Sequence, residues 1–383
     1  MRMGKIYTSM GLMSGTSLDG IDVSIIKSDG YKDYSTELNR YFEYDKELVQ
    51  KLLEIRDKLL NSEDLGRYFS EIKDLEREVT LFHFKAVNET IEKFNSNIDL
   101  IGFHGQTIFH DSKKKISKQL GDGKLLSQLT KKKVVYNFRQ NDLENGGQGA
   151  PLAPIFHNAL ANKIHKKFNL DFPIFILNIG GIANITSTTS WDNLWQSEKI
   201  YAYDIGPGNC LIDEWIRKNS KSEYDNKGSI ARSGKIDKLI LNQALENFNN
   251  NFNYEKSLDI KDFDIFFSKG LSLENGAATI TDFTAKLISD GMSFIHGKNK
   301  PLKFQWLVCG GGRKNDYLLE CIKNNFDKID IDPIDKYEIN GDYIESQAFA
   351  FLAIRSVEGL PISFPSTTRC NEALTGGISV ENY

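Results

Sequence analysis

Ala202-Tyr203-Asp204-Ile205-Gly206-Pro207-Gly208-Asn209 is the stretch that bears most directly on fold and function. Apolar residues lead into Asp204, and a rigid Gly-Pro-Gly turn follows that leaves the backbone open to a ligand. Reactive carboxylates are commonly placed at such a strand end, where a substrate can approach. An Asp that caps a turn by accepting backbone hydrogen bonds would have the same local sequence. The glycine-rich turns elsewhere in the chain favour a reactive carboxylate.

The composition is that of a folded protein with more than one domain. The 383 residues exceed one ordinary hydrophobic core, and 26% charged with 11% aromatic residues argue against disorder. A net charge of −4 provides no general basic surface for nucleic acid. No apolar run is long enough to span a membrane, and the N-terminus lacks the apolar core of a signal peptide. We therefore expect a cytoplasmic protein without a membrane segment.

The cysteines and histidines do not have the spacing of a metal site. The 4 cysteines lie far apart in the sequence, and the 6 histidines form no cluster. Reduced thiols are the simplest expectation for a cytoplasmic protein. A zinc enzyme is not expected.

Strand-like and helix-like segments alternate along the chain, which predicts an α/β fold. A glycine turn follows an apolar strand at Gly15, Gly180 and Gly310, which indicates two related halves. We expect a hairpin around residues 15–20, strands at 98–103, 133–138, 172–179, 182–186 and 304–309, and helices at 47–60, 67–94, 210–219, 235–249, 275–296 and 342–358. Further helices are expected to begin at Pro151, because proline suits a first helical turn, and near Asn315.

Three glycine-rich turns, at residues 11–20, 178–186 and 308–315, could each bind part of a nucleotide. Glycine permits positive φ and lets backbone amides approach a ligand, and successive amides form an anion-binding nest. The first turn is no Walker loop, because no Gly-Lys-Ser/Thr follows, and its spacing is not that of a dinucleotide fingerprint. A tight structural turn explains any one of them alone. Three at strand ends, with the Asp204 turn between the second and third, favour a nucleotide cleft.

A second polar group of residues suits a hydroxyl-rich ligand such as a sugar. Planar side chains with several hydrogen-bonding atoms stand on flexible loops around residues 137–157, and two more are held between glycines at 102–107. A buried core histidine is the alternative for His104. The candidates are His104, Gln106, Arg139, Asp142, Gly147, Gln148, Gly149 and Pro151.

Seven motifs in this sequence resemble those of the anhydro-N-acetylmuramic acid kinase family, within the sugar kinase/heat-shock cognate/actin superfamily. The resemblance covers nearly the whole chain. Seven ordered motifs at compatible spacing are highly specific, although any one of them would not be. They are Gly11–Asp22, Gly102–Thr107, Gly146–Leu152, Asn178–Asn184, Asp204–Asn209, Gly310–Asn315 and Glu345–Ala350.

The resemblance implies an α/β fold with two RNase-H-like (actin-like ATPase) domains flanking a nucleotide and substrate cleft. We place one domain at residues 1–140 with 359–383 and the other at 141–358. The implied cofactors are ATP and Mg²⁺, and the implied state is a homodimer. In the implied reaction, water adds to the anomeric carbon of 1,6-anhydro-N-acetylmuramic acid, the internal ether opens, and O6 takes the γ-phosphoryl group. The products are N-acetylmuramic acid 6-phosphate and ADP, in peptidoglycan recycling.

The resemblance also assigns roles to residues. Asp204 matches the catalytic base that takes a proton from water, and Glu345 matches a carboxylate near the sugar, with a helix surface charge as the alternative. The metal ligand is open, with Asp19 or Asp204 as candidates through water. The turns at 15–20 and 180–184 would bind phosphates, and that at 310–315 adenosine. The ATP-binding candidates are Gly15, Thr16, Ser17, Leu18, Asp19, Gly20, Ile21, Asp22, Asn178, Gly180, Gly181, Asn184, Gly206, Gly208, Asn209, Gly310, Gly311, Gly312, Arg313 and Asn315.

Some positions depart from the family pattern, and other functions remain open. Asn137 stands where family members usually carry Asp, and Lys256 lies in a reduced segment, so its reach to the active site is undecided. One alternative is another sugar kinase of the superfamily without ring opening. A second is a non-enzymatic actin- or chaperone-like ATPase, which would need a peptide-binding or polymer surface. A metal-free glycosidase would not need three glycine turns.

Overall fold

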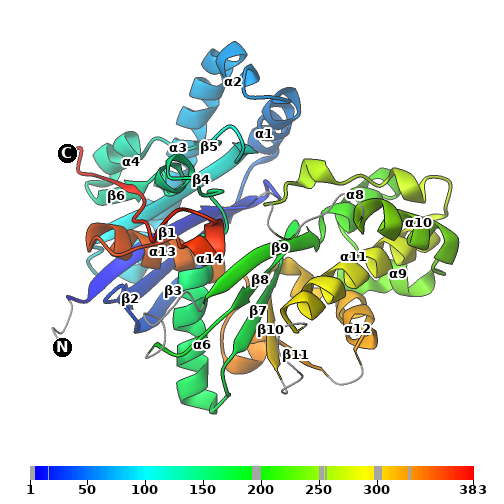
Figure 1. Cartoon of the computed structure of the whole chain (residues 1–383). Helices are drawn as coiled ribbons and strands as arrows, with labels where there is room; N and C mark the ends of the chain where they lie inside the picture. Colours follow the sequence, from blue (N-terminus) through cyan, green and yellow to red (C-terminus); the bar gives the residue numbers. More distant parts are fainter. Residues whose placement is uncertain are drawn as a thin grey trace. The chain divides into compact units, whose positions relative to one another are not determined.

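The structure is a computed structural model that describes residues 5–15, 17–191, 200–249, 254, 257–296, 304–326 and 329–383. The chain forms two compact units, which are described separately (Figure 1). Unit 1 comprises Met1–Lys163, Ser190–Ile200 and Tyr343–Tyr383, and unit 2 comprises Ile164–Thr189 and Tyr201–Asp342.

In the described part of unit 1, a sheet of seven strands has the order β12-β6-β4-β1-β2-β3, with β5 paired to β4. Strands β3, β2 and β1 are antiparallel, whereas β1, β4 and β6 are parallel. The long polar-edged strand β3 and the short strands β5 and β12 were not predicted. The strands are β1 Tyr7–Ser14, β2 Gly20–Ser28, β3 Tyr34–Glu43, β4 Leu100–Asp111, β5 Ile116–Leu120, β6 Lys133–Tyr136 and β12 Ile378–Val380.

Successive side chains of each strand point to opposite faces of this sheet. Helices pack on both of these faces. Leu12 packs in a core with residues of α1 (Lys46–Lys58) and α3 (Phe69–Phe94). On the other face, α13 (Ile344–Val357) packs on β1, β2 and β4. Its backbone comes so close that a Cβ at Gly11 would lie 1.9 Å from the Ser346 carbonyl oxygen. The other helices of at least four residues are α2 Asp64–Arg67, α4 Gly123–Thr130, α5 Gln140–Glu144, α6 Pro154–Phe168 and α14 Pro365–Thr368.

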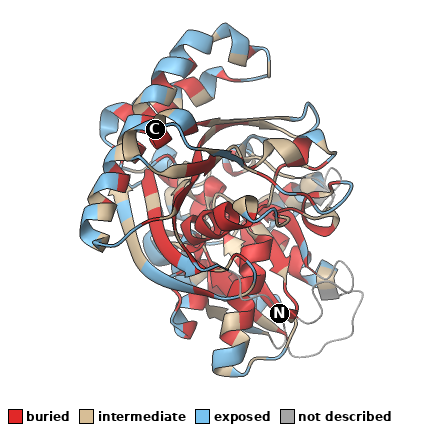
Figure 2. Cartoon of the chain, turned by 90° about the vertical axis from the view of Figure 1, so that its left-hand side faces the viewer, coloured by how far each residue is buried: buried red, intermediate tan, exposed pale blue. Residues whose placement is uncertain are grey.

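Unit 2 repeats the same strand order in a smaller sheet. Its order among the described residues is β11-β10-β7-β8-β9, with an antiparallel β7-β8-β9 set and a parallel β7-β10-β11 set. One large core joins the sheet to its helices, and buried residues concentrate on strands and the helices beside them (Figure 2). The elements are β7 Ile174–Ile179, β8 Ile182–Ser187, β9 Tyr201–Pro207, α8 Cys210–Asn219, α9 Ser229–Ser233, α10 Lys238–Asn249, α11 Leu273–His296, β10 Gln305–Cys309, α12 Asp316–Asn324 and β11 Asp330–Pro333.

The predicted α/β fold with two RNase-H-like sheets is confirmed, with corrections to element limits. Helix α6 begins at Pro154 and not at Pro151, which lies in the preceding loop. The units also divide the chain differently from the predicted domains, since residues 141–163 and 343–358 group with unit 1. Residues 344–357 group with unit 1 because α13 packs on β1, β2 and β4. The 4 cysteines are buried free thiols.

Candidate functional site

The glycine turns of unit 2 are bonded to one another through their backbones. The turn between β7 and β8 contains Gly180 and Gly181, and it contacts the residues that follow β9. The amides of Gly208 and Asn209 donate to the carbonyl oxygens of Gly181 and Gly180, at 2.9 and 2.8 Å. A Cβ at Gly208 would lie 2.2 Å from the Gly180 carbonyl oxygen, so only glycine allows this approach.

The turn after β10 lies against the same residues. Gly310 has φ of 75°, and a Cβ there would lie 2.5 Å from Asn178 Oδ1. A Cβ at Gly312 would lie 2.2 Å from Ile179 Cγ2 and 3.1 Å from Asn209 Oδ1. Segments 178–184, 204–209 and 310–312 therefore form one group, which we call the unit 2 glycine cluster. Asn178 and Asn184 sit in it as a register pair of β7 and β8.

Asp204 belongs to this cluster but lies inside β9 and not at its end. The register passes from the Ala183–Gly206 pair to the Asn184–Asp204 pair, so Ile205 is an extra residue in β9. Bulges of this kind re-aim neighbouring side chains and occur beside active sites. Asp204 is 8% exposed. Its Oδ2 accepts a hydrogen bond from the Leu258 amide at 2.9 Å and one from Ser257 Oγ at 3.3 Å.

Two side chains of the predicted adenosine site, Arg313 and Asn315, form hydrogen bonds within the protein. The Arg313 guanidinium is buried and donates to Asp335 through Nε and Nη2, at 2.6 and 3.1 Å, and to Asp342 at 2.7 Å. Its Nη1 also donates to the Gly310 carbonyl, so Arg313 ties the β10 turn to the 335–342 loop. Asn315 is the N-cap of α12, where its Oδ1 accepts from the Leu318 amide. Both side chains are thus held by protein groups, and their contact with adenosine stays a prediction.

In unit 1 the turn between β1 and β2 is compact and partly exposed. The Leu18 amide donates to the Gly15 carbonyl at 3.3 Å, and Leu18 has φ of 61°. The exposed Ser17 hydroxyl donates to Asp19 Oδ1 at 2.5 Å. Thr16, another predicted contact, lies outside the described residues. Gly20, Ile21 and Asp22 lie in β2, with Ile21 in the core, so a ligand could meet Ile21 only through its backbone.

A bulge in β4 places Gln106 beside this turn. The register passes from Leu12–Phe103 to Ser14–Gln106, which leaves one extra residue in β4. Gly105 has φ of 76°, and a Cβ there would lie 2.4 Å from the Leu120 carbonyl oxygen. Gln106 donates through Nε2 to the Gly15 carbonyl at 2.9 Å. The motif at 102–107 is therefore part of a strand, and its second glycine is required by the bulge.

His104 and Arg139 form a pair with a defined proton position. Arg139 donates through Nη2 to His104 Nε2 at 2.9 Å, so His104 Nδ1 carries the proton and donates to the Gly105 carbonyl at 2.8 Å. Burial and the nearby Arg139 charge hold the pKa of His104 well below its usual value. Arg139 also donates through Nη1 to the Gly149 carbonyl at 2.7 Å. Neutral His104 and the Gly149 carbonyl thus hold Arg139 against the glycine-rich loop at residues 146–151.

Asp142 holds the loop at 146–151 in place from beneath. Its Oδ2 accepts from the Gly149 amide at 2.7 Å, and its Oδ1 accepts from Thr368 Oγ1 at 2.6 Å. A Cβ at Gly147 would lie 2.1 Å from Asp142 Oδ2, which explains that glycine. The Gln148 amide donates to the Thr368 carbonyl at 2.8 Å. Thr368 belongs to α14, far away in sequence, and sequence reasoning missed it because no local pattern marks such a contact.

Glu345 lies in the first turn of α13 and is half-buried. It therefore belongs to unit 1, with His104, Arg139 and the 146–151 loop, whereas Asp204 belongs to unit 2. The reduced segment noted in the sequence around Lys256 also contains Ser257, which contacts Asp204. Lys256 lies outside the described residues.

Oxygen donors for Mg²⁺ are present, although no group of three or more His, Cys, Asp or Glu side chains suited to a metal occurs in the described ranges. Asp19 and Asp204 carry the hard oxygen ligands that this ion prefers. Mg²⁺ usually takes only one or two carboxylates and completes its shell with water and substrate phosphates. Either Asp19 in unit 1 or Asp204 in unit 2 fits the role of the one protein carboxylate in such a site.

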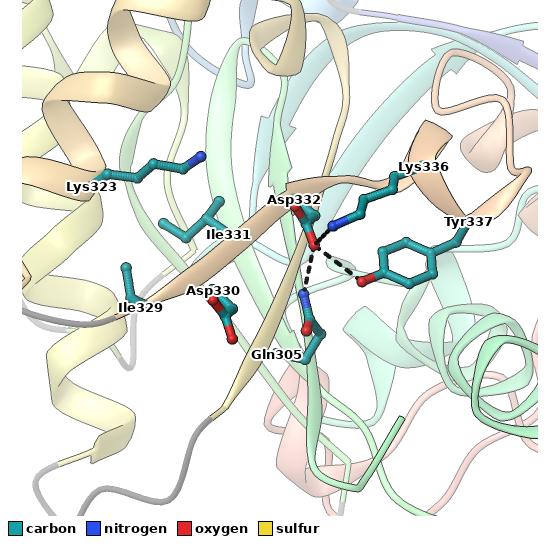
Figure 3. Close-up of a pocket in the computed structure, with 8 residues that line it drawn as sticks. All are labelled: Gln305, Lys323, Ile329, Asp330, Ile331, Asp332, Lys336 and Tyr337. Carbon is teal, nitrogen blue, oxygen red and sulfur yellow. Dashed lines mark hydrogen bonds and ion pairs between the residues drawn. The ribbon is translucent and has the colours of Figure 1, made fainter. Parts of the chain in front are cut away.

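A polar pocket of about 320 Å³ lies elsewhere in unit 2 (Figure 3). Gln305, Lys336 and Tyr337 point toward Asp332, whose Oδ2 accepts from all three at 2.9–3.2 Å. Gln305 begins β10, whereas the glycine turn follows the end of that strand, so this pocket is separate from the unit 2 glycine cluster. Its lining is Gln305, Lys323, Ile329, Asp330, Ile331, Asp332, Lys336 and Tyr337. Within the described chain, no helix is long and apolar enough to cross a membrane.

Comparison with known proteins gives one consistent result. Residues 7–381 match the family described as Anhydro-N-acetylmuramic acid kinase. A protein of that name from Pelagibacter ubique (strain HTCC1062) is 51% identical over 385 residues, which cover 100% of both chains. Two others of the same name come from Rhodospirillum rubrum, at 37% identity over 96% of this chain and 93% of the relative, and from Methylobacterium nodulans, at 36% over 97% and 99%.

Proposed function

The chain belongs to the anhydro-N-acetylmuramic acid kinase family, and on this premise we propose that it phosphorylates 1,6-anhydro-N-acetylmuramic acid while water opens the anhydro ring. It is an ATP-dependent sugar kinase. The products of the proposed reaction are N-acetylmuramic acid 6-phosphate and ADP. We place this step in cytoplasmic peptidoglycan recycling. We also propose that the enzyme is a homodimer, and a mass measurement by sedimentation equilibrium would test this.

Asp204 is the proposed base. It takes a proton from water as the water oxygen bonds to C1 of the sugar and the C1–O6 bond breaks. The freed O6 then bonds to the γ-phosphorus, and the bond from that phosphorus to the β,γ-bridging oxygen breaks to release ADP. Two hydrogen bonds are donated to Asp204 Oδ2, one from the Leu258 amide and one from the Ser257 hydroxyl. They fix the orientation of an acceptor, as a general base requires.

Backbone groups are proposed to bind the nucleotide. The unit 2 glycine cluster and the turn at residues 15–20 would bind phosphates through amides. The Gly310–Gly312 turn, in which Gly311 is exposed, would bind adenosine through its backbone. When bound, Mg²⁺ would be held by phosphate oxygens and by Asp19 or Asp204 through water, and it would offset charge on the γ-phosphoryl group. Phosphoryl transfer needs mainly this positioning and charge neutralisation.

The sugar is proposed to bind to unit 1 residues that the structure holds rigidly. Arg139 is fixed by neutral His104 and by the Gly149 carbonyl. Asp142 has both carboxylate oxygens bonded within the protein, so it supports the 146–151 loop and we assign it no direct contact with substrate. Gln148 and Glu345 remain proposed sugar contacts.

The observation that carries this proposal is the meeting of a buried, hydrogen-bonded carboxylate with three glycine segments in unit 2. The test is incubation of the purified chain with the anhydro sugar, ATP and Mg²⁺ in ¹⁸O-labelled water. The reaction must be stopped early, because the anomeric hydroxyl of the product exchanges with solvent. We expect ¹⁸O at C1 and phosphate at O6 of the same molecule.

Two alternatives predict other results in that experiment. A sugar kinase without ring opening would leave the anhydro sugar unchanged and phosphorylate N-acetylmuramic acid supplied in its place. A nucleotide-driven switch would form ADP at the same rate with and without sugar. Either result would reject the proposed reaction.

A further inference from the structure

A buried side-chain network lies beneath the turn between β1 and β2. It consists of Ser14, Tyr44 and His83, which come from β1, the residue after β3, and α3. Tyr44 donates to Ser14 Oγ at 3.0 Å, and Ser14 Oγ lies 3.0 Å from His83 Nε2. All three residues are almost fully buried, at 1%, 3% and 0% exposure.

The proton positions in this network are determined by its outer partner. His83 Nδ1 lies 2.8 Å from the Val79 carbonyl oxygen, which can only accept, so Nδ1 carries the proton. Burial lowers the pKa of His83 to about 4, so the ring is neutral and Nε2 accepts from the Ser14 hydroxyl. Burial also raises the pKa of Tyr44, which keeps its hydroxyl a donor. The donor sequence therefore runs from Tyr44 to Ser14 to His83, and then to Val79.

Tyr44 contacts both ends of the turn. Its hydroxyl holds Ser14, the residue before Gly15, and its backbone amide donates to the Asp19 carbonyl at 2.9 Å. The Tyr41 hydroxyl donates to the same carbonyl oxygen at 3.0 Å. The Ser14 hydroxyl thus forms its hydrogen bonds with Tyr44 and His83, beneath the turn.

We infer that Tyr44, through Ser14 and His83, is a positioning residue that fixes the β1–β2 turn in the shape that receives nucleotide phosphate. This rests on the proposed function for the phosphate ligand, but the fixing of the turn itself does not. A turn held by side chains on both sides orders its amides before the ligand arrives, which lowers the entropy cost of binding.

The test compares two single-atom deletions in the whole chain. Tyr44→Phe removes the hydroxyl that holds Ser14 and keeps the ring. Tyr34→Phe is the matched control, because Tyr34 is also buried in unit 1 and its hydroxyl has no hydrogen-bond partner among the described residues. Amide exchange of residues 14–20 is measured by mass spectrometry without ligand, and the Kd of ADP with Mg²⁺ is measured by calorimetry.

Tyr44→Phe is expected to speed exchange in residues 14–20 and to weaken ADP binding, each by about three- to tenfold, as for one lost neutral hydrogen bond. The KM for the sugar is expected to stay unchanged, and Tyr34→Phe is expected to behave as wild type. Ser14→Ala should give the same change, and the Tyr44→Phe/Ser14→Ala double variant should add little to it, because both act through one bond.

Equal exchange of residues 14–20 in Tyr44→Phe and Tyr34→Phe would overturn the inference. Faster exchange in Tyr44→Phe with unchanged ADP affinity would also overturn it, since the turn would then be fixed for another purpose. Failure of the wild-type chain to bind ADP would instead count against the proposed nucleotide function, and the exchange result would still decide whether the network fixes the turn.

Discussion

Replacement of the Asp204 carboxylate by a neutral amide should slow the chemical step and leave ATP binding almost unchanged. Asp204→Asn keeps the side-chain shape and an oxygen acceptor for the Leu258 amide, but it removes the proposed base. We expect kcat to fall by about 10²–10⁴-fold, the usual contribution of a general base. The KM for ATP should change little. Steady-state kinetics with coupled detection of ADP measures both constants.

Ser257→Ala is the matched control for this variant, since it removes only the weaker 3.3 Å hydrogen bond to Asp204. It should lower kcat by a much smaller factor than Asp204→Asn. If Asp204→Asn retained kcat within about threefold of wild type, the assignment of Asp204 as base would be wrong.

His83, His104 and His157 are buried neutral, and this makes the stability of the chain depend on pH. Burial lowers the pKa of His83 and of His157 to about 4, and that of His104 well below its usual value. Because the unfolded-state pKa is about 6.5, the unfolded chain binds more protons below that pH. Stability is therefore complete above about pH 6.5 and is lost as the pH falls.

For His83 alone, this loss should be about 2 kcal/mol at pH 5 relative to pH 7. Urea unfolding at pH 7, 6 and 5 measures it. In His83→Gln, which cannot gain that proton, the unfolding free energy should start lower but fall less steeply between pH 6.5 and 5. A slope equal to that of wild type would show that folding does not lower the pKa of His83.

At the scale of elements, the packing of α13 on the unit 1 sheet depends on two glycines. A Cβ at Gly11 would lie 1.9 Å from the Ser346 carbonyl oxygen, and one at Gly102 would lie 2.2 Å from that of Phe349. Backbone atoms cannot move aside as a flexible side chain can. Gly11→Ala should therefore cost at least roughly 1–3 kcal/mol of unfolding free energy, the range for overpacking.

Gly66→Ala is the control for Gly11→Ala, because no described atom lies within 4 Å of a Cβ there and Gly66 lies in α2. It should be neutral or stabilise by up to about 1 kcal/mol. Thermal unfolding followed by circular dichroism compares the two variants. Equal melting temperatures would show that α13 can shift away from β1 without loss.

Much of the secondary structure could be predicted because local patterns encode it. The predicted helix at 210–219 coincides with α8, and the strand predicted at 304–309 is β10 with one residue fewer. Strand β3 could not be predicted, because most of its residues are exposed or half-buried and it depends on pairing with β2. The predicted helix start at Pro151 was wrong because proline suits the first turn of a helix, and this pattern does not distinguish Pro151 from Pro154.

The candidate site was only partly predictable for a related reason. Glycine runs predicted the segments of the unit 2 glycine cluster, since close backbone approach selects glycine in the sequence itself. Three other features depend on residues that are distant in sequence. They are the hydrogen bonds of the Arg313 guanidinium, the contact of Thr368 with Asp142, and the network of Ser14, Tyr44 and His83. Nothing in a local pattern reports which distant carboxylate or hydroxyl a polar side chain will meet.

At the scale of the whole molecule, each ligand should protect its own set of segments from hydrogen exchange. ADP with Mg²⁺ should slow exchange at residues 15–20, 180–184, 206–209 and 310–312. The anhydro sugar should slow it at 104–106 and 139–149, where Arg139 and the glycine loop are held by His104 and Asp142. Saturation at 100 times Kd allows protection of up to about 100-fold for amides that exchange only from the unbound state.

The segment at 329–332, part of the lining of the separate polar pocket, serves as the internal control in the same experiment. Its exchange should be unchanged by either ligand, because it pairs with the first residues of β10, whereas the glycine turn follows the end of that strand. If ADP protected 329–332 and left 180–184 and 310–312 unchanged, the nucleotide would bind at the pocket in Figure 3 and the assignment of the glycine cluster would be wrong. Protection of both regions by ADP would mean that the pocket responds to nucleotide. Wild-type ADP affinity in a Lys336→Ala variant would then show that the nucleotide does not bind in the pocket.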